Sequence, residues 1–160
     1  MISAILLAAG ESKRMKGENK LIKEINGLPL IKHAVKNILG SAIDELIIVL
    51  GHEKSIIENL IKPNKKIKFI FNKNYKNGMS SSITAGLNHM SKKANAFFIC
   101  LGDMPRIDKK IYNYLSSFIK NKDIIVPTYN SVQANPVLFS KSMKSNIMKI
   151  SGDIGAKKIL

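Results

Sequence analysis

Four polar segments carry the residues that can do chemistry, and the first is a small-residue loop with two cations. Ala8, Ala9 and Gly10 follow an apolar run, and Arg14 and Lys20 stand a few residues further on. Small residues let a backbone approach a ligand closely, and their N–H groups can cradle phosphate oxygens. Arg14 adds a planar fork and Lys20 a point charge, which together suit a triphosphate. The spacing fits neither a Walker loop nor a dinucleotide fingerprint, so a plain surface loop remains an equal alternative.

Two aspartates stand beside glycines, one past the middle of the chain and one near its end. Asp103 lies in Leu-Gly-Asp-Met-Pro, directly after an apolar run, where a carboxylate can hold Mg²⁺ against bound phosphates. Asp153 lies in Ser-Gly-Asp-Ile-Gly-Ala and can share that metal or hold a second one. Taken singly, Asp103 in a turn and Asp153 as a helix cap are the simpler interpretations.

The remaining segment, residues 77–82, reads Asn-Gly-Met-Ser-Ser-Ser and leads into a helical pattern. Hydroxyl groups and free N–H groups at a helix N-terminus can bind an anion or a ribose. Simple capping of the helix by Ser80 explains the same residues without a ligand.

No other residues form a recognisable catalytic group. The histidines at positions 33, 52 and 89 are scattered, and Cys100 is the single cysteine, set in the apolar run Phe97–Leu101. A buried, inert thiol is therefore expected, with no disulfide framework and no cysteine-built zinc site. Chemistry by this chain would use the nucleophile of a substrate, helped by a metal and by cations.

The elements that position these segments alternate between strand and helix. Short apolar runs predict parallel strands buried on both faces, at Ile2–Ala8, Leu46–Leu50, Ile67–Phe71, Ala96–Leu101 and Ile124–Val126. Helical spacing lies between them: one helix after Pro29, one around Ile56–Ile61, one that Ser80 would cap and one that Asp108 would cap. This pattern predicts one α/β domain over residues 1–160, a sandwich around a mostly parallel sheet. In such a sheet, ligands lie beyond the carboxyl ends of the strands.

The net charge of +15 comes from 26 Lys and Arg against 11 Asp and Glu. Such an excess suggests an anionic partner, yet Arg14 and Arg106 are the only arginines, and nucleic-acid readers depend on arginine. The 25 Ile and 15 Asn suggest that an A/T-rich genome contributes to the lysine content. We therefore expect no nucleic-acid partner. With no basic leader and no apolar run near the ~18 residues of a membrane span, we also expect no membrane and a cytoplasmic location.

Taken together, the segments resemble a known family. The order Leu-Ala-Ala-Gly-x-Ser-x-Arg-Met, Gly-Met-Ser-Ser-Ser, Leu-Gly-Asp-Met-Pro, Asn-Pro-Val-Leu-Phe and Gly-Asp-x-Gly-Ala is similar to that of MobA-like nucleotidyltransferases. Within the family it is most similar to molybdenum cofactor cytidylyltransferases. The resemblance runs from Ile5 to the last residue. It implies a Rossmann-like three-layer α/β/α sandwich and transfer of a nucleotidyl group from an NTP, with Mg²⁺ as cofactor and pyrophosphate as product.

The resemblance also implies roles for particular residues. Ala8, Ala9 and Gly10 would line the nucleotide, and Arg14 and Lys20 would hold its phosphates during catalysis. The base and ribose would lie beside three further residues of the chain, namely Gly78, Ser80 and Ser81. Asp103 would bind Mg²⁺, and Asp153 would be a second contact to metal or substrate.

By the same resemblance, the substrates are CTP and a phosphate of molybdopterin. Leu-Ala-Ala-Gly and Gly-Met-Ser-Ser-Ser differ from the Leu-Ala-Gly-Gly and Gly-Pro-Leu-Ala-Gly that are usual in the guanylyltransferases. Alternatives are GTP as donor, a sugar or polyol phosphate as acceptor, or a catalytically weak nucleotide-binding domain that delivers cofactor to a molybdoenzyme or its chaperone.

Three departures from the family pattern bear on these expectations. Lys16 is an apparent insertion that moves Lys20 by one position, and Ala134 replaces the Gly that usually precedes Asn-Pro. The sequence also does not include the Asp-rich segment that relatives usually carry after Gly-Asp-x-Gly-Ala. We therefore expect a domain without the usual C-terminal tail, which is either a shortened chain or a minimal or impaired member of the family.

Overall fold

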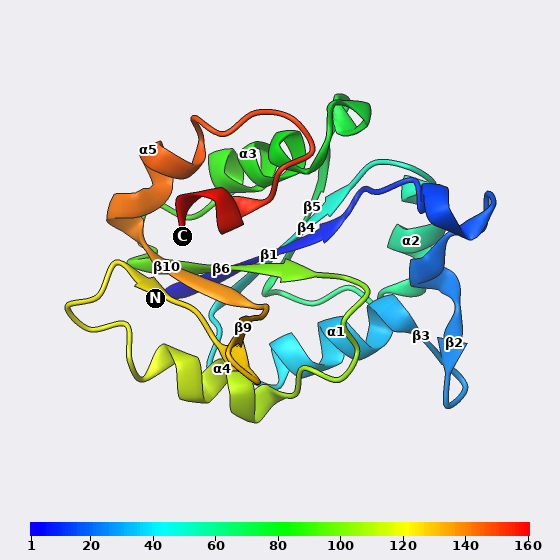
Figure 1. Ribbon diagram of the computed structural model, residues 1–160. Helices are drawn as coiled ribbons and strands as arrows, with labels where there is room; N and C mark the ends of the chain where they lie inside the picture. Colours follow the sequence, from blue (N-terminus) through cyan, green and yellow to red (C-terminus); the bar gives the residue numbers. More distant parts are fainter.

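The computed structural model describes residues 1–160, except for the side chain of Lys157. Its centre is a six-stranded sheet with the strand order β5-β4-β1-β6-β10-β7 (Figure 1). The strands are β1 (Ile2–Ala8), β4 (Glu45–Leu50), β5 (Ile67–Phe71), β6 (Ala96–Leu101), β7 (Ile124–Ile125) and β10 (Val137–Ser140). The pairs β1–β4, β1–β6 and β4–β5 are parallel, whereas β10 runs antiparallel to both β6 and β7. The predicted α/β fold with a mostly parallel sheet is confirmed.

The central strands β1, β4 and β6 are almost entirely buried, as their apolar sequences predict. Burial on both faces was wrong for the two edge strands, because β5 and β7 are only partly covered. At the β5 edge, Lys68 and Phe71 are exposed, and a lysine on an edge strand discourages pairing with another chain. The expected strand at 124–126 is thus a short edge strand.

Helices cover both faces of the sheet and form two outer layers (Figure 1). Their bounds are α1 (Leu30–Leu39), α2 (Lys54–Leu60), α3 (Met79–His89), α4 (Lys109–Ser116) and α5 (Lys144–Ile147). Side chains of α1, α2 and α4 share one core with the sheet, and those of α3 and α5 share the other. This arrangement is the three-layer α/β/α sandwich that the resemblance implies.

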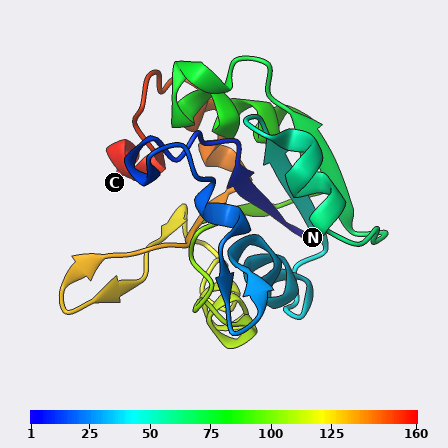
Figure 2. The same cartoon turned by 90° about the vertical axis from the view of Figure 1, so that its right-hand side faces the viewer.

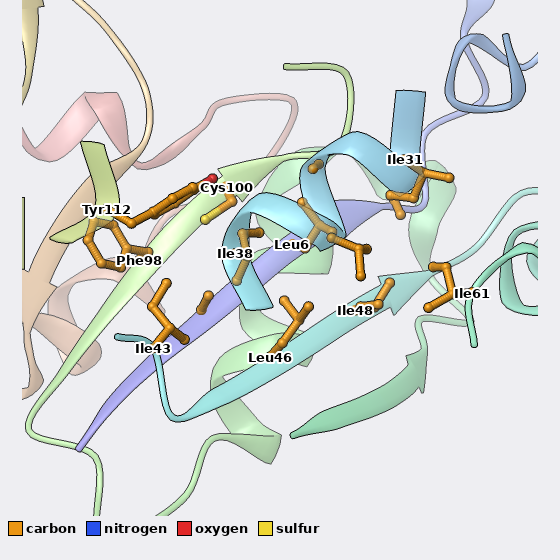
Figure 3. Close-up of a cluster of buried hydrophobic side chains, with 14 of the residues drawn as sticks. Leu6, Ile31, Ile38, Ile43, Leu46, Ile48, Ile61, Phe98, Cys100 and Tyr112 are labelled. Atoms are coloured by element: carbon orange, nitrogen blue, oxygen red, sulfur yellow. The ribbon is translucent and has the colours of Figure 1, made fainter. Parts of the chain in front are cut away.

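The first of these cores contains the single thiol (Figure 3). Cys100 is 1% exposed and lies near Tyr112, whose ring meets Phe98 edge-on with centroids 5.4 Å apart. Burial raises the pKa of the Cys100 thiol to about 12. Because thiolates are the reactive form of cysteine, the expectation of a buried, inert thiol is confirmed.

Two of the helix starts test the predicted caps. Asp108 accepts hydrogen bonds from the N–H groups of Lys110 at 2.8 Å and Ile111 at 3.2 Å, so its predicted role as the cap of α4 is confirmed. Ser80 does not cap α3, because the helix begins one residue earlier and the capping position belongs to Gly78. The Ser80 hydroxyl makes a different bond, which is described with the site below.

The smaller elements are short 3₁₀ helices and two hairpins. The 3₁₀ helices are η1 (Lys13–Met15), η2 (Lys20–Ile22), η3 (Tyr75–Asn77), η4 (Lys141–Met143) and η5 (Ala156–Ile159). One hairpin joins β2 (Glu24–Ile25) to β3 (Leu28–Pro29), and the other joins β8 (Thr128–Tyr129) to β9 (Val132–Gln133). Figure 2 shows the second hairpin, in yellow and orange, standing away from the body of the domain. Among the described residues, the helices are all too short or too polar to cross a bilayer.

Candidate functional site

A cavity of about 790 Å³ opens at the carboxyl ends of β1 and β6. Leu7 near the end of β1 and Leu101 at the end of β6 form part of its base. Strand order reverses here, because β1 connects onward to β4 on one side while β6 lies on the other. A crevice at such a switch point is the usual ligand site of an open α/β sheet, and its volume is typical of small-molecule sites.

One side of the cavity, which we call the loop wall, is formed by residues 9–15, 20 and 21 after β1. Ser12 and Lys16 adopt left-handed backbone conformations on either side of η1, and Gly17 follows with φ +88°. The Ser12 hydroxyl accepts a hydrogen bond from the Lys20 N–H at 3.1 Å, which closes the loop on itself. The apparent insertion at Lys16 is thus absorbed in a turn, and Lys20 still faces the cavity.

Lys20 forms an ion pair with Asp103 in this cavity. Its Nζ lies 3.0 Å from Asp103 Oδ2, and both side chains are less than half exposed. Asp103 follows Gly102, where an added Cβ would lie 3.0 Å from Leu21 and 3.1 Å from Ile31. This tight fit places the carboxylate directly at the end of β6. Arg14 also lines the cavity and is exposed, so it shares this space with the Lys20–Asp103 pair.

The opposite side, which we call the helix wall, is formed by residues 75–82 together with Asp153. Ser80 donates its hydroxyl hydrogen to the carbonyl oxygen of Gly152 at 2.7 Å, and its N–H reaches the same oxygen at 3.3 Å. The Met79 N–H points to Asp153 Oδ1 at 3.4 Å. The start of α3 therefore binds the chain near residues 152–153.

Gly78 is required by this contact. Its φ is +100°, and an added Cβ would lie only 2.7 Å from the backbone atoms of Gly152 and Asp153. L-residues are strained at such a φ, and the overlap would separate the two segments. A buried asparagine supports the same wall from behind, because Asn72 Nδ2 donates to Ser81 Oγ at 2.9 Å and to Ser82 Oγ at 3.0 Å.

The structure brings most of the predicted site residues into this one cavity. The lining residues among them are Ala9, Gly10, Arg14, Lys20, Gly78, Asp103 and Asp153. Three others do not line it: Ala8 is buried in the first core, Ser80 is bonded to Gly152, and Ser81 donates to the carbonyl oxygens of Gly78 and Asn74. Ser80 and Ser81 therefore hold the helix wall, whereas Ala8 is part of the core.

Sequence reasoning missed several residues that line the cavity. Tyr75 and Lys76 of η3 face it, and Lys76 adds a further cation to Lys13, Arg14 and Lys20. No local motif marks these two residues. No role was assigned to Gly51 after β4, although an added Cβ there would lie 2.6 Å from Tyr75 and 2.8 Å from Ala9.

Asp103 and Asp153 supply oxygen ligands to the cavity from its two sides. Among the described residues, no group of three or more His, Cys, Asp or Glu side chains gathers closely enough to form a complete metal cage. Mg²⁺ is ordinarily held by one or two carboxylates together with substrate phosphates. The donor set therefore fits a divalent cation that arrives with a phosphorylated substrate.

Comparisons with known proteins agree with this fold. The chain is 28% identical over 138 residues to the bifunctional protein GlmU of Aquifex aeolicus, covering 86% of this chain and 29% of that protein. The structure superposes on Rv0371c of Mycobacterium tuberculosis with a TM-score of 0.88 at 20% identity, covering 99% of this chain and 80% of the other. A manganese complex of Rv0371c gives a TM-score of 0.83 at 19% identity, with the same coverage.

The chain spans about a third of the length of the curated relatives that it matches. A family match, by contrast, covers nearly all of the chain. Residues 4–160 match the MobA-like NTP transferase domain. With its α/β/α fold and its cavity at the switch point, this chain belongs to the family of MobA-like NTP transferase domains.

Proposed function

We propose that this protein is a nucleotidyltransferase, which moves a nucleoside monophosphate from an NTP to an oxygen of a phosphorylated acceptor. The supporting observation is that Arg14 and the Lys20–Asp103 ion pair line one cavity together with the small residues of the loop wall. Family membership over residues 4–160 supports an NTP as the donor. The cavity volume of about 790 Å³ accommodates a nucleotide.

In the proposed reaction, a phosphate oxygen of the acceptor attacks the α-phosphorus of the NTP in line. A bond forms between that oxygen and the α-phosphorus, the bond to the β-phosphate bridging oxygen breaks, and pyrophosphate leaves with the electron pair. Arg14 and Lys20 stabilise the charge that develops on the transferring and leaving phosphates. Ala9 and Gly10 let the loop backbone approach the nucleotide. Positioning and charge stabilisation suffice, because the nucleophile belongs to the acceptor.

Asp103 and Asp153 would hold a divalent cation, which we propose to be Mg²⁺. A bound cation there would neutralise charge on the triphosphate. The two carboxylates line one cavity, and a manganese complex exists for the structurally similar Rv0371c. Both observations support the proposal of a divalent metal cofactor.

The finer proposal is CTP as donor and molybdopterin as acceptor, in a reducing cytoplasm. It rests on the resemblance of Leu-Ala-Ala-Gly and Gly-Met-Ser-Ser-Ser to the molybdenum cofactor cytidylyltransferases. GTP and a sugar or polyol phosphate are the competing substrates. Delivery of cofactor to a molybdoenzyme is the alternative without catalysis.

The test is pyrophosphate release by the purified protein with each of the four NTPs in Mg²⁺. Each NTP is combined with molybdopterin, with sugar phosphates and with polyol phosphates. We expect turnover with CTP and molybdopterin that requires both substrates and disappears in EDTA. Turnover with another pair would replace the finer proposal, whereas nucleotide binding without any turnover would favour the delivery role. Absence of both binding and turnover would contradict the proposed function.

A further inference from the structure

We propose that Asn19 and Glu53 are positioning residues, which hold the loop wall in the geometry that places Lys20 beside Asp103. This inference rests on the proposed function for its ligand, but its central observation is a contact between the loop and the end of β4. Neither residue lines the cavity, so both would act through the residues that do.

The segment after β4 ties down both ends of the loop. At the start of the loop, the Ala9 carbonyl oxygen accepts a hydrogen bond from the His52 N–H at 3.2 Å. At its other end, Asn19 Nδ2 donates to Glu53 Oε2 at 3.2 Å. Two adjacent residues of one segment therefore fix the two ends of the loop that lines one side of the cavity.

Asn19 is the buried element of this arrangement, with 6% of its surface exposed. Its Oδ1 accepts a hydrogen bond from the Leu21 N–H at 3.1 Å, which caps η2. The same side chain thus joins the Glu53 carboxylate to the helical turn that begins with Lys20. A buried amide that satisfies both its donor and its acceptor groups orients its neighbours strongly. Lys20, the next residue, reaches Asp103 at 3.0 Å.

Glu53 adopts a left-handed backbone conformation, with φ +52°. A residue with a Cβ is strained in that region, where glycine would be relaxed, and such strain often marks a functional constraint. Glu53 occupies the capping position of α2, yet its side chain makes no capping hydrogen bond to that helix. Its carboxylate is instead directed to Asn19, with His52 Nε2 at 3.5 Å from the second oxygen. The contact with the loop accounts for a charged side chain at this strained position.

Replacing Glu53 by glycine separates a positioning role from a purely structural one. Glu53→Gly relieves the backbone strain, so the melting temperature is expected to stay the same or rise. The replacement removes the acceptor of the Asn19 amide hydrogen bond, so the loop is expected to lose protection from hydrogen exchange. Glu53→Gln keeps a side-chain oxygen that can accept the same hydrogen bond, and Glu58→Gln is the control on the exposed face of α2.

The experiment measures two quantities for each variant. Hydrogen exchange followed by mass spectrometry reports protection of residues 10–20, and calorimetric titration with CTP in Mg²⁺ reports nucleotide affinity. Glu53→Gly is expected to exchange faster in residues 10–20 and to bind CTP about tenfold more weakly. Asn19→Asp, which faces Glu53 with a second carboxylate, is expected to act in the same direction. Glu53→Gln and Glu58→Gln are expected to match the parent protein in both measurements.

Wild-type protection and wild-type CTP affinity in Glu53→Gly would overturn the proposal. Faster exchange without loss of affinity would also overturn it, because the Asn19–Glu53 hydrogen bond would then have no effect on nucleotide binding. A parent protein that binds none of the four NTPs would instead contradict the proposed function. In that case, hydrogen exchange alone decides whether the Asn19–Glu53 hydrogen bond holds the loop. Residues 10–20 should then exchange faster in Glu53→Gly but not in Glu53→Gln.

Discussion

Gly10 and Gly78 line opposite sides of the same cavity, and they are glycines for different reasons. At Gly10 an added Cβ would meet no atom within 4 Å. At Gly78 it would overlap the backbone of Gly152 and Asp153 at 2.7 Å, and φ is +100°. The folded chain therefore requires glycine at 78 but not at 10. A small residue that the fold does not need, facing a cavity, is what close approach of a ligand would explain.

The two walls differ in the same way. The loop wall carries exposed cations and is tied down through side-chain hydrogen bonds, including those of Ser12 and Asn19. The helix wall is held by close packing of glycine against backbone and by the bonds of Ser80 to Gly152. Changes in the helix wall should therefore affect mainly stability, whereas changes in the loop wall should affect mainly ligand binding.

The largest effect on stability is expected for Gly78→Ala. Backbone strain and overlap with Gly152 should lower the free energy of unfolding by about 2–3 kcal/mol, and the melting temperature by roughly 5–10 °C. Gly27→Ala is the matched control, because Gly27 also has a positive φ but no atom within 4 Å of an added Cβ. The control should lose about 1 kcal/mol. Equal losses in a thermal melt would show that the contact with Gly152 contributes nothing.

A smaller loss is expected for Ser80→Ala. The variant removes the 2.7 Å hydrogen bond to Gly152, while the Ser80 N–H still reaches the same oxygen at 3.3 Å. The expected cost is about 1 kcal/mol, together with faster hydrogen exchange in residues 150–160. Ser55→Ala, on the exposed face of α2, is the control. Unchanged exchange in residues 150–160 would remove the bond from the description of the helix wall.

Lys20→Ala should leave stability nearly unchanged and weaken nucleotide binding. Because the pair with Asp103 is partly exposed, its loss should alter the free energy of unfolding by less than about 1 kcal/mol. Loss of a charge-assisted contact to phosphate should weaken CTP binding roughly 10–100-fold in a calorimetric titration. Lys62→Ala is the control for the loss of one positive charge, because Lys62 is also exposed and lies far from Lys20 in the sequence. Equal affinities for the two variants would mean that Lys20 does not contact the phosphates.

The fold followed from the sequence where burial dominates. The runs at Ile2–Ala8 and Ala96–Leu101 coincide with β1 and β6, because short apolar segments rich in Ile and Phe suit a covered sheet. The burial of the edge strands β5 and β7 was less predictable, since it depends on neighbours that lie far away in sequence. β10 was not assigned as a strand, because its four residues pair across the sheet with β6 and β7.

The cavity residues were predictable where a motif marked them, as for Gly10, Lys20 and Asp103. The position of Ser80 was not, because a serine near a helix start ordinarily caps it, and only the folded chain brings Gly152 within reach. Lys76 and Asn19 were missed for the same reason: their positions depend on long-range contacts that leave no local pattern.

The most direct test of the difference between the walls is Gly10→Ala, measured for melting temperature and for CTP affinity in Mg²⁺. An unaltered or slightly raised melting temperature is expected, because the added methyl group meets open space. A loss of affinity of about tenfold or more is expected, since the methyl group would keep the nucleotide from the loop backbone. Full CTP affinity in a stable Gly10→Ala protein would contradict the assignment of the loop wall as the nucleotide-binding surface.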